Sequence, residues 1–286
     1  MTIRPRRSAL YMPASNPRAL EKAPGLDSDV LIIDMEDSVA PEAKETARAQ
    51  AVASLQAGGF GHRELVLRVN GLNTPLGEHD LKAPAKSKAQ AVLLPKIESA
   101  FDVQRAEALL AGSSQSIWCM IETPKGVLAA AEIAQASPRL GCFVLGTSDL
   151  AKDLRCAHTP DRLPLLYSLS HVLLAARAYG LACLDGVHLD LNDDEGFARS
   201  CHQGREMGFD GKTLIHPKTL EVANRIFSPT DEEIAQARKI SAAFLAAKAE
   251  GKGVVVVDGR LVEQLHVEQA QHLLALAETV GHGVRS

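Results

Sequence analysis

The feature that most constrains the fold of this chain is an alternation of short apolar runs with helix-forming stretches. Each run is continuous and rich in Val, Ile or Leu, as expected for strands that are buried on both faces of a parallel sheet. The eight runs lie at residues 9–12, 30–33, 65–69, 91–94, 117–121, 142–145, 181–184 and 212–215. Eight strands that alternate with helices predict an α/β fold, a closed (β/α)8 TIM barrel. An open six-stranded sheet is the alternative, but no glycine-rich dinucleotide turn supports it.

The segments between the runs have helical character. Residues 42–55 and 99–110 have a helix-forming composition, and Pro124 and Pro217 stand where first helical turns are expected. We expect these helices to surround the barrel.

The pattern changes after residue 226. Residues 231–249 predict one long Ala-rich helix, and Asp258-Gly259 predicts the tight turn of a small hairpin. A final helix is expected from about residue 263 to residue 280. We therefore predict a barrel domain over residues 1–227 and a helix–hairpin–helix extension over residues 228–286.

Composition narrows the class of protein. Hydrophobic residues make up 46% of the 286 residues, enough for a sizeable core. The net charge is −4 and aromatic residues are only 4%, with no basic stripe, which argues against nucleic-acid binding. No run of about 18 apolar residues predicts a membrane span. Five cysteines without a CxxC pair, and a first apolar stretch too short for a signal peptide, predict a reducing, cytoplasmic location.

Polar side chains follow most of the apolar runs at the point where each predicted strand ends. They include Asp34, Glu36, Asp37, Arg68, Lys96, Glu122, Asp149, Asp185 and His216. The carboxyl ends of barrel strands converge on one mouth, where enzymes of this architecture carry their sites. Carboxylates gathered there need a counter-charge, which a divalent cation together with Arg68 supplies. Oxygen ligands of this kind indicate Mg²⁺, which takes one or two carboxylates directly and keeps several waters.

Taken alone, several of these residues also have structural explanations. Glu122 and Asp149 suit the first turn of a helix, where acids are favourable. Arg68 suits a buried ion pair with a partner such as Glu36. Asp34 suits a strand end at which its carboxylate accepts backbone N–H groups.

The motifs together resemble the citrate lyase β-subunit-like proteins of the HpcH/HpaI aldolase/citrate lyase family, near the malyl-CoA and citramalyl-CoA lyases. The matching segments run in order over nearly the whole chain and comprise RSALYMP (7–13), LIIDMEDSV (31–39), LRVN (67–70), LPK (94–96), IETP (121–124), GTSDL (146–150), GFDGKTLIHP (208–217) and DGRLVE (258–263).

The resemblance implies a site for a metal and a coenzyme A (CoA) thioester. It implies Mg²⁺, with Mn²⁺ as an alternative, held by Glu122 and Asp149, with Glu122 also contacting substrate. Glu36 and Asp37 would support the site through Arg68 and metal-bound water. Arg68 itself would bind the substrate carboxylate.

The resemblance also implies assembly. Acyl-CoA lyases of this family form homotrimers or hexamers in which the C-terminal segment of one subunit covers a neighbour's site. The lid acid that moves a proton is an Asp in many relatives, and Glu263 stands at the matching position here. Asp258 is the other acid of this segment, although the Asp-Gly turn already explains it.

The activity expected from these residues is Mg²⁺-dependent carbon–carbon cleavage of a 3-hydroxyacyl-CoA thioester of the malyl, citramalyl or citryl type. The products would be a 2-oxo acid and an acyl-CoA. Two alternatives remain: a (3S)-malyl-CoA-type thioesterase that uses the same site, and a citrate lyase β subunit that acts on an acyl carrier protein thioester.

Overall fold

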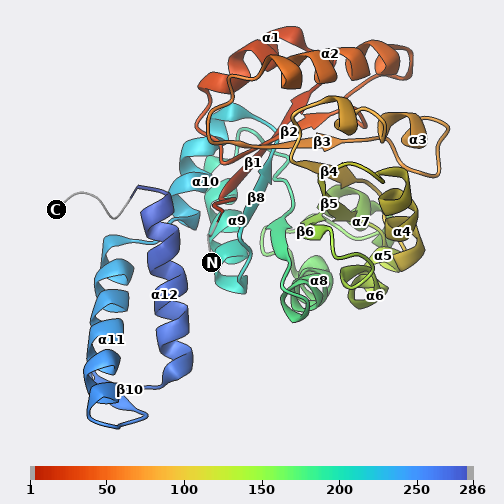
Figure 1. Ribbon diagram of the computed structural model, residues 1–286. Helices are drawn as coiled ribbons and strands as arrows, with labels where there is room; N and C mark the ends of the chain where they lie inside the picture. Colours follow the sequence, from red (N-terminus) through yellow and green to blue (C-terminus); the bar gives the residue numbers. More distant parts are fainter. Residues whose placement is uncertain (1–3, 282–286) are drawn as a thin grey trace. The chain divides into compact units, whose positions relative to one another are not determined.

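The computed structural model describes residues 4–281, apart from the side chain of Ala85, and its main element is a closed barrel of eight parallel strands (Figure 1). Each strand pairs with the next in sequence, and β8 returns to pair with β1. This arrangement confirms the predicted (β/α)8 barrel. The strands are β1 (Ser8–Pro13), β2 (Val30–Asp34), β3 (Glu64–Arg68), β4 (Ala91–Leu94), β5 (Ser116–Ile121), β6 (Leu140–Leu145), β7 (Ala182–Asp185) and β8 (Gly211–Leu214).

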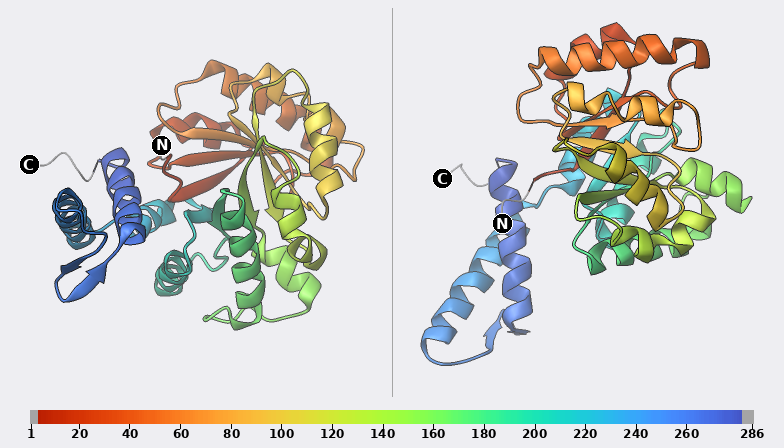
Figure 2. Two further views of the ribbon diagram at one scale, coloured as in Figure 1. Left: turned by 60° about the horizontal axis from the view of Figure 1, so that its bottom comes forward. Right: turned by 45° about the vertical axis from the view of Figure 1, so that its right-hand side comes forward.

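Helices follow the strands and surround the barrel, as the left view of Figure 2 shows. Several begin where the sequence supplies a cap: the Asn16, Ser99, Thr123 and Asp193 side chains each accept an N–H of the first turn. The helices are α1 (Pro17–Lys22), α2 (Lys44–Ala57), α3 (Gly77–Asp80), α4 (Ala100–Leu109), α5 (Pro124–Leu128), α6 (Ala130–Ala134), α7 (Thr147–Leu154), α8 (Leu166–Ala178), α9 (Asp194–Met207) and α10 (Leu220–Phe227).

Apolar side chains from all but one of the barrel strands fill a shared core. Its members include Val30, Val66, Leu93, Trp118 and Val144, each fully buried. The large Trp118 ring lies under the guanidinium of Arg6, 4.9 Å from the ring centroid. Arg6 also pairs with Glu64 at 2.7 Å, where β3 begins. The amino-terminal end of the barrel is therefore closed by packing and a partly buried ion pair.

A charge cluster with a fully buried ion pair at its centre joins the last two strands. Asp185, at the end of β7, accepts from Lys212 Nζ of β8 at 2.8 Å, and neither side chain has exposed surface. Both Asp185 oxygens are also 2.7 Å from Nη1 of Arg162, in the loop before α8. Burial alone would raise the pKa of Asp185, but the two cations and their hydrogen bonds lower it. The cluster holds β7, β8 and the loop together at the closure of the barrel.

The described residues divide into two compact units, Arg6–Asn224 and a second unit that begins at Arg225 and also includes Arg4 and Pro5. The division falls three residues before the expected boundary at residue 227. In the second unit, α11 (Asp231–Ala249) lies beside α12 (Gln264–Thr279) (Figure 1). A hairpin of β9 (Val255–Val257) and β10 (Arg260–Val262) connects them.

A helix cap and the expected hairpin turn help to build this second unit. Thr230 and Glu233 form a reciprocal capping box at the start of α11. Asp258 and Gly259 both have positive φ, 51° and 75°, as a tight hairpin turn requires. Phe244, Val257, Val262 and Val267 form its apolar core. Within residues 4–281, no helix is long and apolar enough to cross a membrane.

Replacing Asp185 with Asn is expected to destabilise the barrel by about 3–5 kcal/mol, because Lys212 would be left buried without a counter-charge. Urea unfolding followed by circular dichroism measures this loss. Because the pKa of Asp185 is lowered in the folded state, its contribution is present at neutral pH and disappears as the pH falls through that lowered pKa. Glu195→Gln is the control, since the Glu195 side chain is 92% exposed and pairs only at the surface. A loss below 1 kcal/mol for Asp185→Asn would contradict the structural role.

Candidate active site

A buried ion pair joins the carboxyl ends of β2 and β3. Asp34 and Arg68 end these strands and are register partners across the pair. Arg68 Nε and Nη2 donate to the two Asp34 oxygens, each at 2.6 Å. Burial alone would raise the pKa of Asp34, but the charge and hydrogen bonds of Arg68 lower it. The guanidinium is thereby held in one orientation at the barrel mouth.

Asp34 also shapes the segment that follows β2. Its oxygens accept the backbone N–H of Glu36 at 2.8 Å and of Ser38 at 3.2 Å. The turn brings Glu36 to Arg68 Nη1 at 2.9 Å and Asp37 to the same atom at 3.7 Å. Glu36 is buried, whereas the Asp37 side chain is 61% exposed. One aspartate therefore orders both the arginine and the acids around it.

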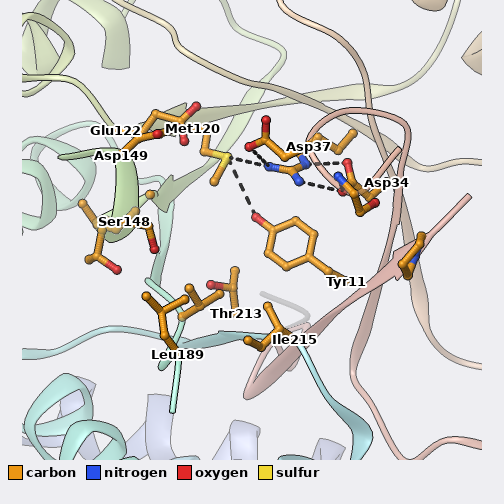
Figure 3. Close-up of a pocket in the computed structure, with 17 residues that line it drawn as sticks. Tyr11, Asp34, Asp37, Met120, Glu122, Ser148, Asp149, Leu189, Thr213 and Ile215 are labelled. Carbon is orange, nitrogen blue, oxygen red and sulfur yellow. Dashed lines mark hydrogen bonds and ion pairs between the residues drawn. The ribbon is translucent and has the colours of Figure 1, made fainter. Parts of the chain in front are cut away.

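The other side of the Arg68 guanidinium faces an aromatic ring and a sulfur atom. The guanidinium carbon lies 4.7 Å from the centroid of the Tyr11 ring. Arg68 Nη1 and the Tyr11 hydroxyl both point to the Met120 sulfur, at 3.7 and 3.9 Å (Figure 3). A thioether is a weak acceptor. These two donors can therefore bind a carboxylate or carbonyl oxygen more strongly than they bind Met120.

Glu122 is placed by the end of β5 and by its neighbours. Its side chain is almost fully buried, and its Oε1 accepts the backbone N–H of Lys96 at 2.8 Å. Gly146 lies so close that a Cβ at this position would overlap the Glu122 side chain. Desolvation, with the charge of Glu36 adding to it, raises the pKa of Glu122 to about 7.

The side chain of Lys96 lies among further carboxylates. Its Nζ is 2.5 Å from Glu36 Oε1, 3.8 Å from Asp37 Oδ1 and 3.8 Å from Asp149 Oδ2. Desolvation lowers the pKa of Lys96, but the hydrogen bond to Glu36 and the surrounding negative charges outweigh it and raise the pKa. Asp149, in the first turn of α7, is half-buried. Lys96 thus connects the β2, β5 and β6 ends of the mouth.

These side chains border a cavity of about 410 Å³. Figure 3 shows Glu122 and Asp149 on one side and Leu189, Thr213 and Ile215 on the other. The lining comprises Tyr11, Pro13, Asp34, Asp37, Ser38, Arg68, Met120, Glu122, Leu145, Gly146, Thr147, Ser148, Asp149, Val187, Leu189, Thr213 and Ile215. The cavity therefore combines an acidic wall with a largely apolar one.

The residues expected at the site fall into two groups. Glu36, Asp37, Arg68, Glu122 and Asp149 come together at the mouth, from four different strand ends. Glu263 lies in the C-terminal unit, before α12, where His266 Nδ1 accepts its backbone N–H.

Two expected acids have partners elsewhere. Asp258 of the hairpin turn pairs with Lys239 of α11. Asp185 is buried against Lys212 and does not line the mouth cavity.

Three residues that line or border the site had no role assigned from the sequence. Lys96, Tyr11 and Met120 each lie within a strand or directly after it. The signal for Lys96 was its place after a strand, and that for Tyr11 was its place in the first matching motif. Met120 carried no signal, because an apolar strand residue is usually explained by packing alone.

The donor set fits a hard divalent cation. Around the Lys96 ammonium stand Glu36, Asp37 and Asp149, and Glu122 is bonded to its backbone, so carboxylates outnumber the cation. Among residues 4–281, no three His, Cys, Asp or Glu side chains form a ready-made metal cage. Mg²⁺ does not need one, since it takes one or two protein carboxylates and completes its shell with water and ligand oxygens.

A comparison with known families identifies the chain. The model of the HpcH/HpaI aldolase/citrate lyase family matches residues 7–217, which include all eight barrel strands. The chain belongs to this family. It is therefore an enzyme of an aldolase and lyase family, and the site lies where barrel enzymes carry out their chemistry.

Individual relatives cover nearly the full length. The chain is 50% identical over 276 residues, 96% of each sequence, to a (3S)-malyl-CoA thioesterase of Cereibacter sphaeroides. It is 36% identical over 281 residues to the citrate lyase subunit beta of Leuconostoc mesenteroides, covering 95% of this chain and 93% of the relative. Among solved structures, the CitE protein of Mycobacterium tuberculosis in complex with magnesium, acetoacetate and coenzyme A matches with a TM-score of 0.80 and 31% identity. That match covers 97% of this chain and all of the other.

Gly146→Ala tests the placement of Glu122 without removing a carboxylate. The added methyl would displace the Glu122 side chain, so if Glu122 is a metal ligand, we expect Mg²⁺ affinity to fall roughly 10- to 100-fold, as it does when groups that orient metal ligands are lost. Isothermal titration with Mg²⁺ measures the change. Gly25→Ala is the control, because a Cβ there meets nothing within 4 Å. Equal affinity in the two variants would show that Glu122 does not need this position.

Proposed function

We propose that this protein is a Mg²⁺-dependent carbon–carbon lyase that cleaves a 3-hydroxyacyl-CoA thioester of the malyl, citramalyl or citryl type. The observation that carries the proposal is the pairing of an acidic wall, around Glu122 and Asp149, with two donors, Arg68 Nη1 and the Tyr11 hydroxyl, that both face the weak acceptor Met120. A substrate with a hydroxyl beside a carboxylate matches both halves. The products are a 2-oxo acid and an acyl-CoA.

Arg68 and Tyr11 have the role of binding the substrate carboxylate. The Asp34 pair occupies one edge of the guanidinium and fixes it, so that Nη1 is directed to the cavity side with the Tyr11 hydroxyl. A charged acceptor replaces the Met120 sulfur and forms the stronger, charge-assisted bonds. The same contacts balance charge on the oxo acid as it forms.

Glu122 and Asp149 are the proposed metal ligands, with Glu36 and Asp37 supporting them. When bound, Mg²⁺ lowers the pKa of the substrate hydroxyl and polarises the neighbouring oxygen. Glu122 must be ionised to act as a ligand, and its pKa of about 7 makes the proton easy to lose near neutral pH. Lys96 holds Glu36 through a hydrogen bond and Arg68 holds it through charge, which keeps this acid from taking the ligand positions.

The proposed cleavage is a retro-Claisen reaction. The hydroxyl passes its proton to a lid carboxylate, its oxygen becomes the carbonyl oxygen of the 2-oxo acid, and the electrons of the carbon–carbon bond pass to the acyl-CoA as an enolate. The enolate carbon then takes up a proton. We propose Glu263 as the acid that moves this proton, supplied by the C-terminal extension of a neighbouring subunit in a homotrimer or hexamer.

Hydrolysis of the thioester is the second candidate. It is favoured by the relative at 50% identity, whose name is (3S)-malyl-CoA thioesterase. The same wall and donors would hold a malyl thioester, and water would attack its carbonyl carbon. A third possibility, a citrate lyase β subunit that acts on a carrier-protein thioester, is represented by the more distant relatives. Such a subunit would co-purify with partner subunits and turn over free CoA esters slowly.

The deciding assay offers the purified enzyme and Mg²⁺ a panel of malyl-, citramalyl- and citryl-CoA, and follows 2-oxo acid and free thiol separately. Oxo acid without free thiol supports cleavage, and free thiol without oxo acid supports hydrolysis and overturns the lyase. Glu122→Ala and Asp149→Ala are expected to abolish the Mg²⁺-dependent turnover, because each removes a proposed ligand. Full turnover by either variant would refute the metal assignment.

Mixing two inactive variants tests whether sites are shared between subunits. Arg68→Ala lacks the carboxylate-binding residue and Glu263→Ala lacks the lid acid, so each homo-oligomer is expected to be inactive. A mixed oligomer contains some sites that combine an intact Arg68 with an intact Glu263, and partial activity is expected to return. Native mass spectrometry confirms the mixing. Mixed oligomers without recovered activity would contradict a lid that acts on a neighbour.

A further inference from the structure

Lys96 has an unusual backbone for a residue of its type. It lies two residues after the end of β4 at Leu94 and has a φ of 53°, in the left-handed region that side-chain-bearing residues rarely adopt. This conformation accompanies the hydrogen bond from its backbone N–H to Glu122 Oε1 at 2.8 Å. Surrounding structure must stabilise such a backbone, and strained positions of this kind cluster at functional sites.

The ammonium of Lys96 lies within 4 Å of three carboxylates of the barrel mouth. It bonds to Glu36 Oε1 at 2.5 Å and lies 3.8 Å from both Asp37 Oδ1 and Asp149 Oδ2. The Arg68 guanidinium, in contrast, is committed to Asp34 on one edge. Lys96 is also only half-buried, and its four-carbon stem is flexible, so its head can move.

We propose that Lys96 is a displaceable counter-cation: it keeps the acidic wall assembled when no metal is bound, and it sets how tightly the divalent ion binds by competing for Asp149. The proposal rests on the proposed function, because it takes Glu122 and Asp149 as the metal ligands. A lysine ammonium and a divalent ion repel each other at such short range. Binding of the ion therefore drives the ammonium away from Asp149 and onto Glu36, to which it is already bonded.

Two consequences separate this role from that of a residue that simply supports the site. Loss of the Lys96 charge leaves the ion-free protein with mutually repelling carboxylates, so it melts at a lower temperature. The same loss removes the competitor, so Mg²⁺ binds more tightly. A residue that only supported the metal ligands would weaken Mg²⁺ binding when replaced.

The test uses Lys96→Met, which removes the charge and keeps a long side chain. Mg²⁺ affinity is measured by isothermal titration, and melting temperatures are measured with and without Mg²⁺, on the full-length protein. We expect about tenfold tighter Mg²⁺ binding, equal to about 1.4 kcal/mol. We also expect a lower melting temperature without the ion and a larger rise when the ion is added. Lys96→Asn is the second charge-removing variant, since Asn tolerates a left-handed backbone.

Lys152→Met is the matched control. Its ammonium also lies near Asp149, at 3.9 Å from Oδ1, but its side chain is 76% exposed. Solvent screens that charge, so its removal is expected to change Mg²⁺ affinity less than twofold. Lys96→Arg keeps the charge and is expected to bind Mg²⁺ about as the unaltered protein does.

The outcomes also distinguish this inference from the proposed function. If the unaltered protein binds Mg²⁺ but both charge-removing variants bind it equally or more weakly, the role of Lys96 is overturned and the metal site stands. If the unaltered protein binds no Mg²⁺ and matches Glu122→Gln in the same titration, the metal assignment fails and this inference fails with it.

Discussion

The candidate site depends on the buried pair of Asp34 and Arg68. The two residues end adjacent strands at matching register positions, so the barrel itself brings them together. Asp34 fixes the guanidinium and also orders the turn that presents Glu36 and Asp37. Loss of either partner would leave an uncompensated buried charge. Folding and ligand binding therefore depend on the same pair. In a surface site, by contrast, residues can be replaced without an effect on the stability of the fold.

Around this pair, the remaining groups have bonding capacity that the protein alone does not satisfy. Glu122 is buried with a raised pKa, so its ionised form lacks a sufficient counter-charge. The Tyr11 hydroxyl and Arg68 Nη1, which also pairs with Glu36, both donate to the Met120 thioether, a weak acceptor. The acidic wall favours a cation and the donors favour an anion. A metal-chelating hydroxy acid satisfies both at once, and this explains why the site suits such a substrate better than an isolated anion or an isolated ion.

The barrel and much of the site could be predicted from the sequence, because burial of a strand and the position of its carboxyl end are local properties. Glu36, Arg68, Glu122 and Asp149 follow apolar runs, and barrel geometry alone brings such positions together. The ammonium position of Lys96 depends on a left-handed backbone that no motif reveals. Asp185 also follows an apolar run, yet Lys212 and the distant Arg162 bury it. Side-chain pairings between segments that are distant in sequence therefore could not be predicted from local sequence patterns.

The Asp185, Lys212 and Arg162 cluster has a consequence for how this barrel can change. Its Asp185 and Lys212 side chains have no exposed surface, its charges compensate one another, and its members do not line the mouth cavity. The charges that hold β7 and β8 together are therefore different from the charges that line the ligand cavity. Substitutions at the barrel mouth can therefore alter the reaction while the contact between β7 and β8 is kept. The same barrel can in this way support different substrate specificities.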